Sequence, residues 1–113
     1  MPFIATTTNV AISPETEQSL KQKLGEAIAI IPGKSEDWLM LSFRAETPMY
    51  FQGDGAPALF AEVSLFGSAD PQYYSQMTAE LTKIYAEALS VSPSRVYVTY
   101  AEVGHWGWNG RNF

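Results

Sequence analysis

The sequence repeats its own pattern after about half its length, and this duplication constrains the fold more than any other feature. A shift of about 57 positions overlays the two halves, although few of the matched residues are identical. The matched pairs share a residue type: Pro14 with Pro71, Leu24 with Leu81, Ser42 with Thr99 and Phe43 with Tyr100. The chain of 113 residues is therefore interpreted as a single domain, 1–113, made of two similar units at about 2–57 and 58–113.

Each unit has the pattern of a strand, a helix and a second strand. In the first unit, the β-rich run Phe3–Thr8 precedes Ser13-Pro14, where a hydroxyl can cap a helix and proline suits its first turn. Pro32-Gly33 ends that helix, and Trp38–Arg44 is predicted to be the second strand. The apolar residues between these points recur at helical spacing and predict one buried face: Leu20, Leu24, Ala27, Ile28 and Ile31.

The second unit follows the same order. Ala58–Phe66 predicts a strand, Asp70-Pro71 caps a helix, and Arg95–Ala101 predicts the last strand of the pattern. The connection between the units is rich in turn residues and allows a short strand at Met49–Phe51. Gly53-Asp54-Gly55 within it is interpreted as a turn, because the lysine and helix of a phosphate-binding loop are missing. The apolar stripe of the second helix is Met77, Leu81, Ile84, Tyr85 and Ala88.

Two βαβ units with right-handed crossovers place both helices on one face of a four-stranded mixed sheet, an α/β (α+β) fold. Strict alternation along the strands leaves the other face too apolar to be solvated and too polar for a dry core. This composition favours a cyclic homo-oligomer whose sheets close around a barrel-like interior. The predicted residues of that face are Phe3, Ala5, Thr7, Met40, Ser42, Arg44, Phe60, Glu62, Ser64, Tyr97 and Thr99.

The composition excludes several classes of function. The absence of cysteine removes thiolate nucleophiles and zinc-thiolate sites, and His105 is the one histidine, interpreted as a solvated loop residue. We therefore expect no metal and no cofactor. A net charge of −5 without a basic stripe argues against nucleic-acid binding. No apolar run reaches the ~20 residues of a membrane span, and no signal peptide is recognisable, so we expect a cytoplasmic location.

The proline at position 2 has two explanations. Proline is tolerated at the first residue of a strand or on an edge, where no N–H is needed for the ladder. Alternatively, removal of the initiator methionine before such a small residue would leave Pro2 with a free secondary amine. The residues of this segment alone favour the first explanation.

Four segments resemble the macrophage migration inhibitory factor family of the tautomerase superfamily, and the resemblance runs along the whole chain. They are "MPF" at the start, "GK" at Gly33-Lys34, "SPSRVYVTY" at Ser92–Tyr100 and "GWNGRNF" at Gly107–Phe113. The resemblance implies a homotrimer with active sites at its subunit interfaces. It also implies a cofactor-independent keto–enol isomerase that acts on aryl pyruvates such as phenylpyruvate, and on dopachrome derivatives.

The resemblance assigns the chemistry to three residues. Pro2 would be the catalytic acid/base, its amine kept neutral by apolar surroundings and by the charge of Lys34. Lys34 would bind the substrate carboxylate, a role compatible with the favourable placement of a lysine at a helix end. Phe66 would contribute its backbone N–H to the same carboxylate, and its side chain narrows a pocket where the family usually has an aliphatic residue.

The resemblance also implies a substrate pocket shared between subunits. Tyr97 would come from the neighbouring subunit and line the aryl site. Thr99 stands where the family commonly has a longer asparagine, which weakens the expected recognition of hydroxylated aryl substrates. The remaining wall residues would be Trp38, Trp106, Trp108 and Phe113.

Two other functions stay open at this point. Animal members of the family act as cytokines and leave the cell without a signal peptide, so a cytokine-like or host-mimic protein with residual tautomerase activity is the alternative. No receptor surface is recognisable in the sequence. A hydratase or dehalogenase of the superfamily is a weaker idea, since no arginine and acid set for activating water can be placed. Ala58-Leu59-Phe60-Ala61 stands where some members carry CxxC, so thiol–disulfide oxidoreductase activity is excluded.

Overall fold

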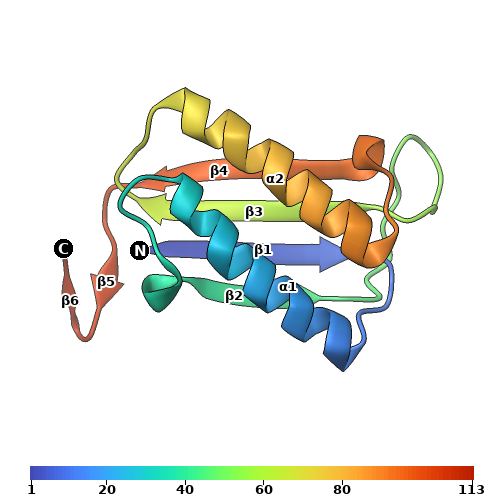
Figure 1. Cartoon of the computed structure of the whole chain (residues 1–113), viewed down its shortest axis with the longest axis horizontal. Helices are drawn as coiled ribbons and strands as arrows, with labels where there is room; N and C mark the ends of the chain where they lie inside the picture. The colour runs from blue at the N-terminus through green and yellow to red at the C-terminus, as the bar shows by residue number, and fades with distance from the viewer.

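Two helices lie across the same face of a four-stranded sheet in the computed structural model, which describes residues 1–113 (Figure 1). The strands are β1 (Pro2–Thr8), β2 (Met40–Arg44), β3 (Leu59–Phe66) and β4 (Val96–Val103), in the order β2-β1-β3-β4. β1 runs parallel to β2, β3 runs parallel to β4, and the two pairs meet antiparallel at the β1–β3 junction. The predicted mixed sheet of two βαβ units is confirmed.

Both helices begin at the predicted caps. The Ser13 hydroxyl accepts a hydrogen bond from the Thr16 N–H at 3.1 Å at the start of α1 (Pro14–Ala27). Asp70 caps α2 (Pro71–Leu89) in the same way. A short 3-10 turn, Ile28–Ile30, continues α1 toward the loop that carries Lys34. No helix is both long and apolar enough to cross a membrane.

The core lies between the helices and the sheet. Two threonines of β1 face it, and both hydroxyls are satisfied. The Thr6 hydroxyl shares a 2.6 Å hydrogen bond with the Tyr85 hydroxyl, and Thr8 donates to the Ala58 carbonyl at 2.7 Å. The apolar residues of the core cluster come from both halves of the chain: Ile4, Leu20, Leu24, Ala27, Ile28, Ile31, Leu59, Ala61, Val63, Leu65, Met77, Leu81, Ile84, Tyr85, Leu89 and Val91.

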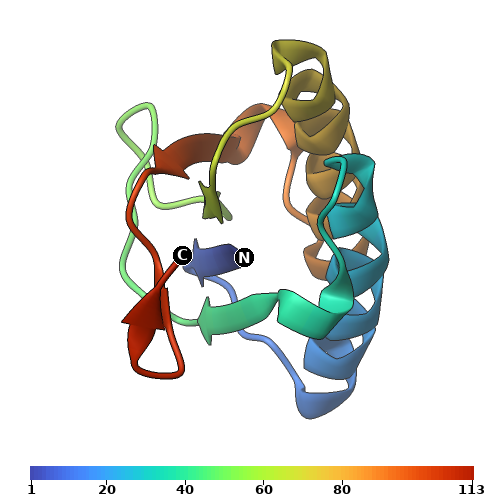
Figure 2. The same cartoon turned by 90° about the vertical axis from the view of Figure 1, so that its left-hand side faces the viewer.

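The opposite face of the sheet is open, as predicted. Met40 and Tyr97 on this face are 66% and 60% exposed, and the charged Arg44 and Glu62 are exposed on it as well. Figure 2 shows the helices on one side of the sheet, with the 45–57 connection and the C-terminal hairpin on the other side. A single chain therefore leaves a broad face of mixed polarity uncovered.

Several element boundaries differ from the prediction. Trp38 ends a 3-10 turn, Glu36–Trp38, closed by the Leu39 N–H on the Glu36 carbonyl at 3.1 Å, so it precedes β2. Arg95 likewise ends the 3-10 turn Pro93–Arg95, because Pro93 starts a tight turn before β4. Met49–Phe51 forms no strand, and only an isolated bridge joins Phe51 to Asp54.

The C-terminal segment forms a small hairpin that the sequence analysis did not predict. β5 (Gly107–Trp108) pairs antiparallel with β6 (Arg111–Asn112) through a two-residue turn. The turn residues Asn109 and Gly110 have φ values of 53° and 82°, which an Asn-Gly pair adopts readily. The hairpin returns the end of the chain toward its beginning, as Figure 1 and Figure 2 both show.

Candidate active site

The first strand begins next to the end of β3. Pro2 is buried and pairs with Leu65, and the Met1 carbonyl accepts a hydrogen bond from the Phe66 N–H at 3.0 Å. Burial, and after it the charge of Lys34, lowers the pKa of the Met1 amine below its ordinary value of 8.0. The surroundings of the chain start therefore shift the protonation equilibrium of an amine toward its neutral form.

Lys34 reaches this place from the loop that follows the first helix. Gly33 has a φ of +80°, which favours glycine, and the Lys34 N–H donates to the Ile31 carbonyl at 3.1 Å. The half-buried side chain then places its ammonium Nζ 2.9 Å from the Phe66 carbonyl. The ammonium thus lies at the end of β3, beside the chain start.

Four aromatic side chains form a continuous cluster at the same end of the sheet, here called the terminal aromatic cluster: Trp38, Phe66, Trp108 and Phe113. The Trp38 and Trp108 rings meet edge to face with centroids 4.9 Å apart. Phe113 connects the cluster, since its ring centroid lies 6.3 Å from that of Trp108 and 5.6 Å from that of Phe66. Aromatic pairs at these distances contribute specific packing as well as burial.

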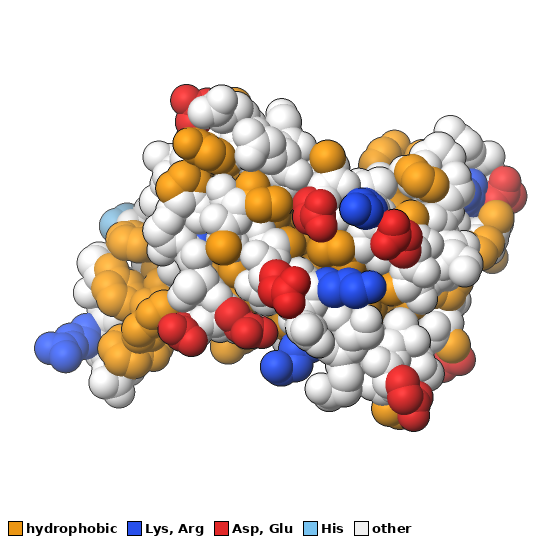
Figure 3. All heavy atoms as spheres, viewed as in Figure 1, with side chains coloured by type: hydrophobic (Ala, Val, Ile, Leu, Met, Phe, Trp, Pro, Cys, Tyr) orange, Lys and Arg blue, Asp and Glu red, His pale blue; other side chains and the backbone are white.

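The cluster is only partly covered. Trp38, Trp108 and Phe113 are 48%, 50% and 55% exposed, and Figure 3 shows hydrophobic side chains gathered over the C-terminal hairpin. Large rings at this exposure on one surface indicate a binding surface or a subunit contact. Trp106 joins through its backbone, because its carbonyl accepts the Phe113 N–H at 3.1 Å.

Two of the predicted site residues lie away from this end. Tyr97 pairs with Phe60, whereas Pro2 pairs with Leu65, five positions further along β3 and roughly 17 Å away at the strand rise of about 3.3 Å per residue. Thr99 pairs with Glu62 and also projects from the open face. One chain alone therefore brings together Pro2, Lys34 and the terminal aromatic cluster, but neither Tyr97 nor Thr99.

The sequence analysis missed two contributors to the geometry of these groups. The Met1 carbonyl occupies the Phe66 N–H, which no sequence pattern indicates. Phe51 packs edge to face against Tyr97, with ring centroids 5.0 Å apart. The hairpin that carries Trp108 could have been predicted from Asn109-Gly110, because this residue pair strongly favours a two-residue hairpin turn. His105 is exposed in a loop, in agreement with its interpretation as a solvated residue.

The fold and site together define a small α/β protein with a duplicated βαβ sheet, a buried proline at the first residue of β1, a lysine near the chain start and a partly exposed aromatic cluster. Comparison with known families agrees with this description, because the family model described as "Macrophage migration inhibitory factor (MIF)" matches residues 1–113. The chain belongs to the macrophage migration inhibitory factor family. This membership supports a tautomerase or cytokine-like role.

Individual relatives are similar over nearly their whole length. A macrophage migration inhibitory factor from Meriones unguiculatus is 28% identical, with 100% of this chain and 99% of the relative covered. The D-dopachrome decarboxylase-B of Xenopus laevis is 26% identical over 97% of this chain and 95% of its own. The crystal structure of Leishmania major MIF2 is 33% identical with a TM-score of 0.94, covering 100% of this chain and 97% of that chain.

Proposed function

We propose that the protein is a cofactor-independent keto–enol tautomerase of aryl pyruvates such as phenylpyruvate, with the amine of Pro2 as acid and base. The observation that carries the proposal is the lowered pKa of the amine at the chain start, caused by burial and by Lys34. Proton transfer next to a carbonyl needs a base that is neutral near pH 7 and can return its proton.

Removal of Met1 would transfer the free amine to Pro2. Pro2 is buried in the chain that carries Met1, so we expect burial to disfavour the charged form of its amine as well. The Pro2 nitrogen then takes a proton from the carbon next to the carbonyl, and that C–H electron pair becomes the C=C bond of the enol. The π pair of the carbonyl moves to its oxygen, which takes a proton from water, and the hydroxide left behind takes the proton from the Pro2 ammonium, so that water and the neutral amine are both restored. The reverse sequence converts the enol to the keto form. The ring holds the nitrogen in a fixed direction toward the substrate.

The same removal would prepare a carboxylate site. The Phe66 N–H loses its partner when the Met1 carbonyl leaves, and the Lys34 ammonium lies 2.9 Å from the Phe66 carbonyl. One charged donor and one backbone donor suit the carboxylate of a pyruvate. Binding the acid there directs the neighbouring carbonyl carbon toward Pro2.

The aryl group would enter between two subunits of a homotrimer. Trp38, Trp108 and Phe113 supply one wall from the chain that carries Pro2, with Trp106 behind them. Tyr97 lies at the opposite end of the open face and Thr99 near its middle, so we expect both to serve the Pro2 of a neighbouring copy. The mixed polarity of that face supports its enclosure within an oligomer. Thr99 is short, so we expect little discrimination in favour of hydroxylated rings.

The test is the rate of phenylpyruvate enol–keto conversion in Pro2→Gly. We expect a loss of about 10²-fold or more, the range that a positioned acid/base supplies, with the trimer intact in sedimentation. Lys23→Gln on the exposed surface of α1 is the control and should retain the wild-type rate. Full activity in Pro2→Gly would contradict the proposal. Absence of activity in the wild type, together with binding to a receptor, would favour the cytokine-like alternative.

A further inference from the structure

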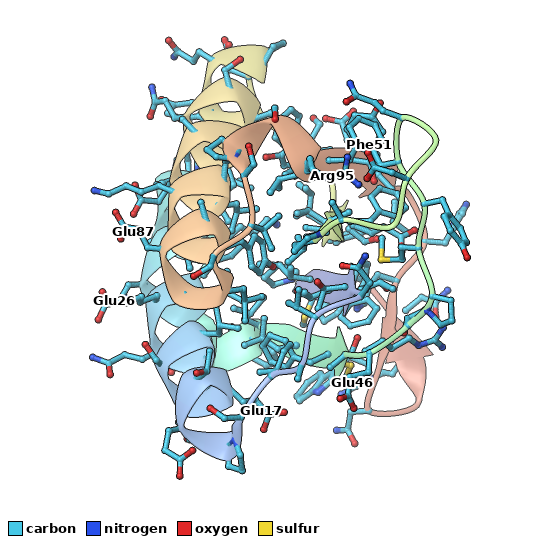
Figure 4. The ribbon with its side chains drawn as sticks, turned by 90° about the vertical axis from the view of Figure 1, so that its right-hand side faces the viewer. Glu17, Glu26, Glu46, Phe51, Glu87 and Arg95 are labelled. Atoms are coloured by element: carbon cyan, nitrogen blue, oxygen red, sulfur yellow. The ribbon has the colours of Figure 1, made fainter.

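The guanidinium of Arg95 connects residues 49–57, here called the 49–57 loop, to the start of β4. Arg95 donates from Nε to the Pro57 carbonyl at 2.9 Å and from Nη1 to the Phe51 carbonyl at 3.2 Å. Nη2 donates to the carbonyls of Ala56 at 3.1 Å and Asp54 at 3.4 Å, and pairs with the Asp54 carboxylate at 3.0 Å. Figure 4 shows Arg95 and Phe51 side by side at this corner of the molecule.

This contact set needs an arginine. Its planar fork presents five N–H donors in fixed directions, whereas a lysine would supply one compact charge on a flexible stem. The Arg95 side chain is only 12% exposed, so its charge depends on the four carbonyls and the Asp54 carboxylate. The shape of the loop and the position of the guanidinium therefore depend on each other.

The loop itself is a tight turn with Phe51 at its base. The Phe51 and Asp54 backbones exchange hydrogen bonds at 2.9 and 3.2 Å, and the Asp54 carboxylate accepts the Ala56 N–H at 3.0 Å. Gln52 and Gly53 between them have φ values of 52° and 84°. Phe51 consequently has little backbone freedom, and its ring direction is set by what lies on either side.

The Phe51 ring lies between Arg95 and Tyr97. The guanidinium carbon is 5.2 Å from the Phe51 ring centroid, within the range of a cation–π contact. The Tyr97 ring packs edge to face against Phe51 with centroids 5.0 Å apart and planes at 79°. Tyr97 is otherwise 60% exposed, so in this chain the Phe51 ring is its defined aromatic support.

We propose that Arg95 is a positioning residue that fixes the direction of the Tyr97 ring through Phe51, and thereby sets the affinity of the neighbouring subunit's site for its aryl substrate. The inference rests on the proposed function, because it concerns the substrate wall of that site. A ring that is already oriented loses less freedom when a ligand packs against it. Arg95 acts on the site through the Phe51 and Tyr97 rings, so we expect it to leave the proton transfer itself unchanged.

The test is a double-mutant cycle between Arg95→Gln and Tyr97→Ala, with phenylpyruvate as substrate. In the wild-type background, Arg95→Gln should raise KM about 5-fold, a typical result of losing preorganisation, with kcat and the pH dependence of kcat/KM unchanged. In the Tyr97→Ala background the same change should leave KM unaltered. Equal increases of KM in both backgrounds would overturn the proposal, because Arg95 would then act independently of Tyr97.

Conservative variants separate positioning from general support of the fold. Arg95→Lys should show most of the KM increase, since it keeps the charge and loses the fork. Asp54→Asn should show a small increase, because the four carbonyl contacts of Arg95 remain. Lys83→Gln, which removes an exposed cation of α2, is the control and should match the wild type. An Arg95→Lys protein with a wild-type KM would contradict the proposal.

A second readout does not depend on catalysis. With ring-labelled tyrosine, the NMR signal of Tyr97, assigned through Tyr97→Phe, should shift in both Arg95→Gln and Phe51→Leu. The four tyrosines outside the 49–57 loop, Tyr73, Tyr74, Tyr85 and Tyr100, should keep their signals. If the wild type does not convert phenylpyruvate, the proposed function fails. The spectrum still tests whether Arg95 orients the Tyr97 ring through Phe51. An unchanged Tyr97 signal in folded Phe51→Leu overturns the inference even if Arg95→Gln does not fold.

Discussion

The Met1 carbonyl accepts the Phe66 N–H at 3.0 Å, and this bond joins the first residue of the chain to the end of β3. The next residue, Pro2, carries the nitrogen proposed as the base, and Phe66 carries the N–H proposed to bind the carboxylate. One cleavage would therefore release both groups. While Met1 stays in place, the nitrogen is an amide and the N–H is occupied.

A chain with one alanine inserted between Met1 and Pro2 tests this coupling. Removal of methionine would leave alanine in front of Pro2, which converts the proline nitrogen into an amide without basicity. We expect phenylpyruvate conversion to fall at least as far as in Pro2→Gly, by about 10²-fold or more. Mass spectrometry establishes the first residue of each protein, and an extended chain with the wild-type rate would contradict the mechanism.

The charge of Lys34 should be visible in the pH profile. Burial and Lys34 both lower the pKa of the terminal amine, and the neutral amine is the base, so kcat/KM should rise with pH through that pKa and level off above it. Lys34→Gln removes the second cause and leaves burial. The rise should move to higher pH, and KM should increase through loss of the carboxylate contact. Lys23→Gln, a control of equal charge change, should leave the profile in place.

The terminal aromatic cluster should affect substrate affinity more than turnover. Trp108 contacts both Trp38 and Phe113, so Trp108→Ala removes two ring contacts at once. We expect KM for phenylpyruvate to rise about 10-fold, comparable to one or two aromatic pairs, with a small change in kcat. Trp108→Phe should recover part of the affinity. Steady-state kinetics measures both, and an unchanged KM in Trp108→Ala would remove Trp108 from the pocket.

Mixed assemblies test the division of the site between chains. Lys34→Ala and Tyr97→Ala should each be poor enzymes, because each lacks one part of every site. After joint unfolding and refolding in equal amounts, about a quarter of the sites in a random cyclic assembly combine an intact Lys34 with an intact Tyr97 from the neighbour. Activity of the mixture should therefore exceed that of either parent. A mixture that is merely the average would indicate that the site lies within one chain.

The buried Thr6–Tyr85 pair should contribute to stability. Tyr85→Phe leaves the Thr6 hydroxyl without its 2.6 Å partner, at a cost of about 1–3 kcal/mol in the free energy of unfolding. Urea titration measures this, and Thr6→Val combined with Tyr85→Phe should recover much of the loss.

Burial raises the pKa of Tyr85 to about 12, so the unfolded chain ionises first as pH rises above about 10. Stability should then fall between these values, and less steeply in Tyr85→Phe.

The duplicated pattern made the fold predictable. Paired helix caps at Ser13 and Asp70, together with apolar residues at helical spacing, placed the elements, and alternation along the strands identified the open face. Boundaries were less predictable where tight turns end next to a strand. Trp38 and Arg95 are residue types that strands accept. Each is nevertheless the last residue of a 3-10 turn, one that begins with two acidic residues and one that begins with proline.

The sequence motifs suggested residues for the candidate site, but they did not predict the contacts that these residues make. Pro2, Lys34 and the aromatic residues were named from motifs. The bond between Met1 and Phe66 depends on the register of β1 against β3, which pairs segments far apart in the chain. The bond from Arg95 to Phe51 spans 44 positions, and an arginine before a strand has no pattern that identifies its partners. Long-range register and the geometry of a multidentate side chain require the folded chain.

The C-terminal hairpin places Phe113 against Phe66, so the two extremities of the polypeptide converge on one small region. An affinity tag or a fluorescent fusion at the N-terminus would block the nitrogen that we propose as the base, and one at the C-terminus would crowd the aromatic cluster that we propose as the substrate wall. Reporters for purification or imaging are better inserted in an exposed internal loop, because we expect either terminal attachment to abolish the proposed tautomerase activity.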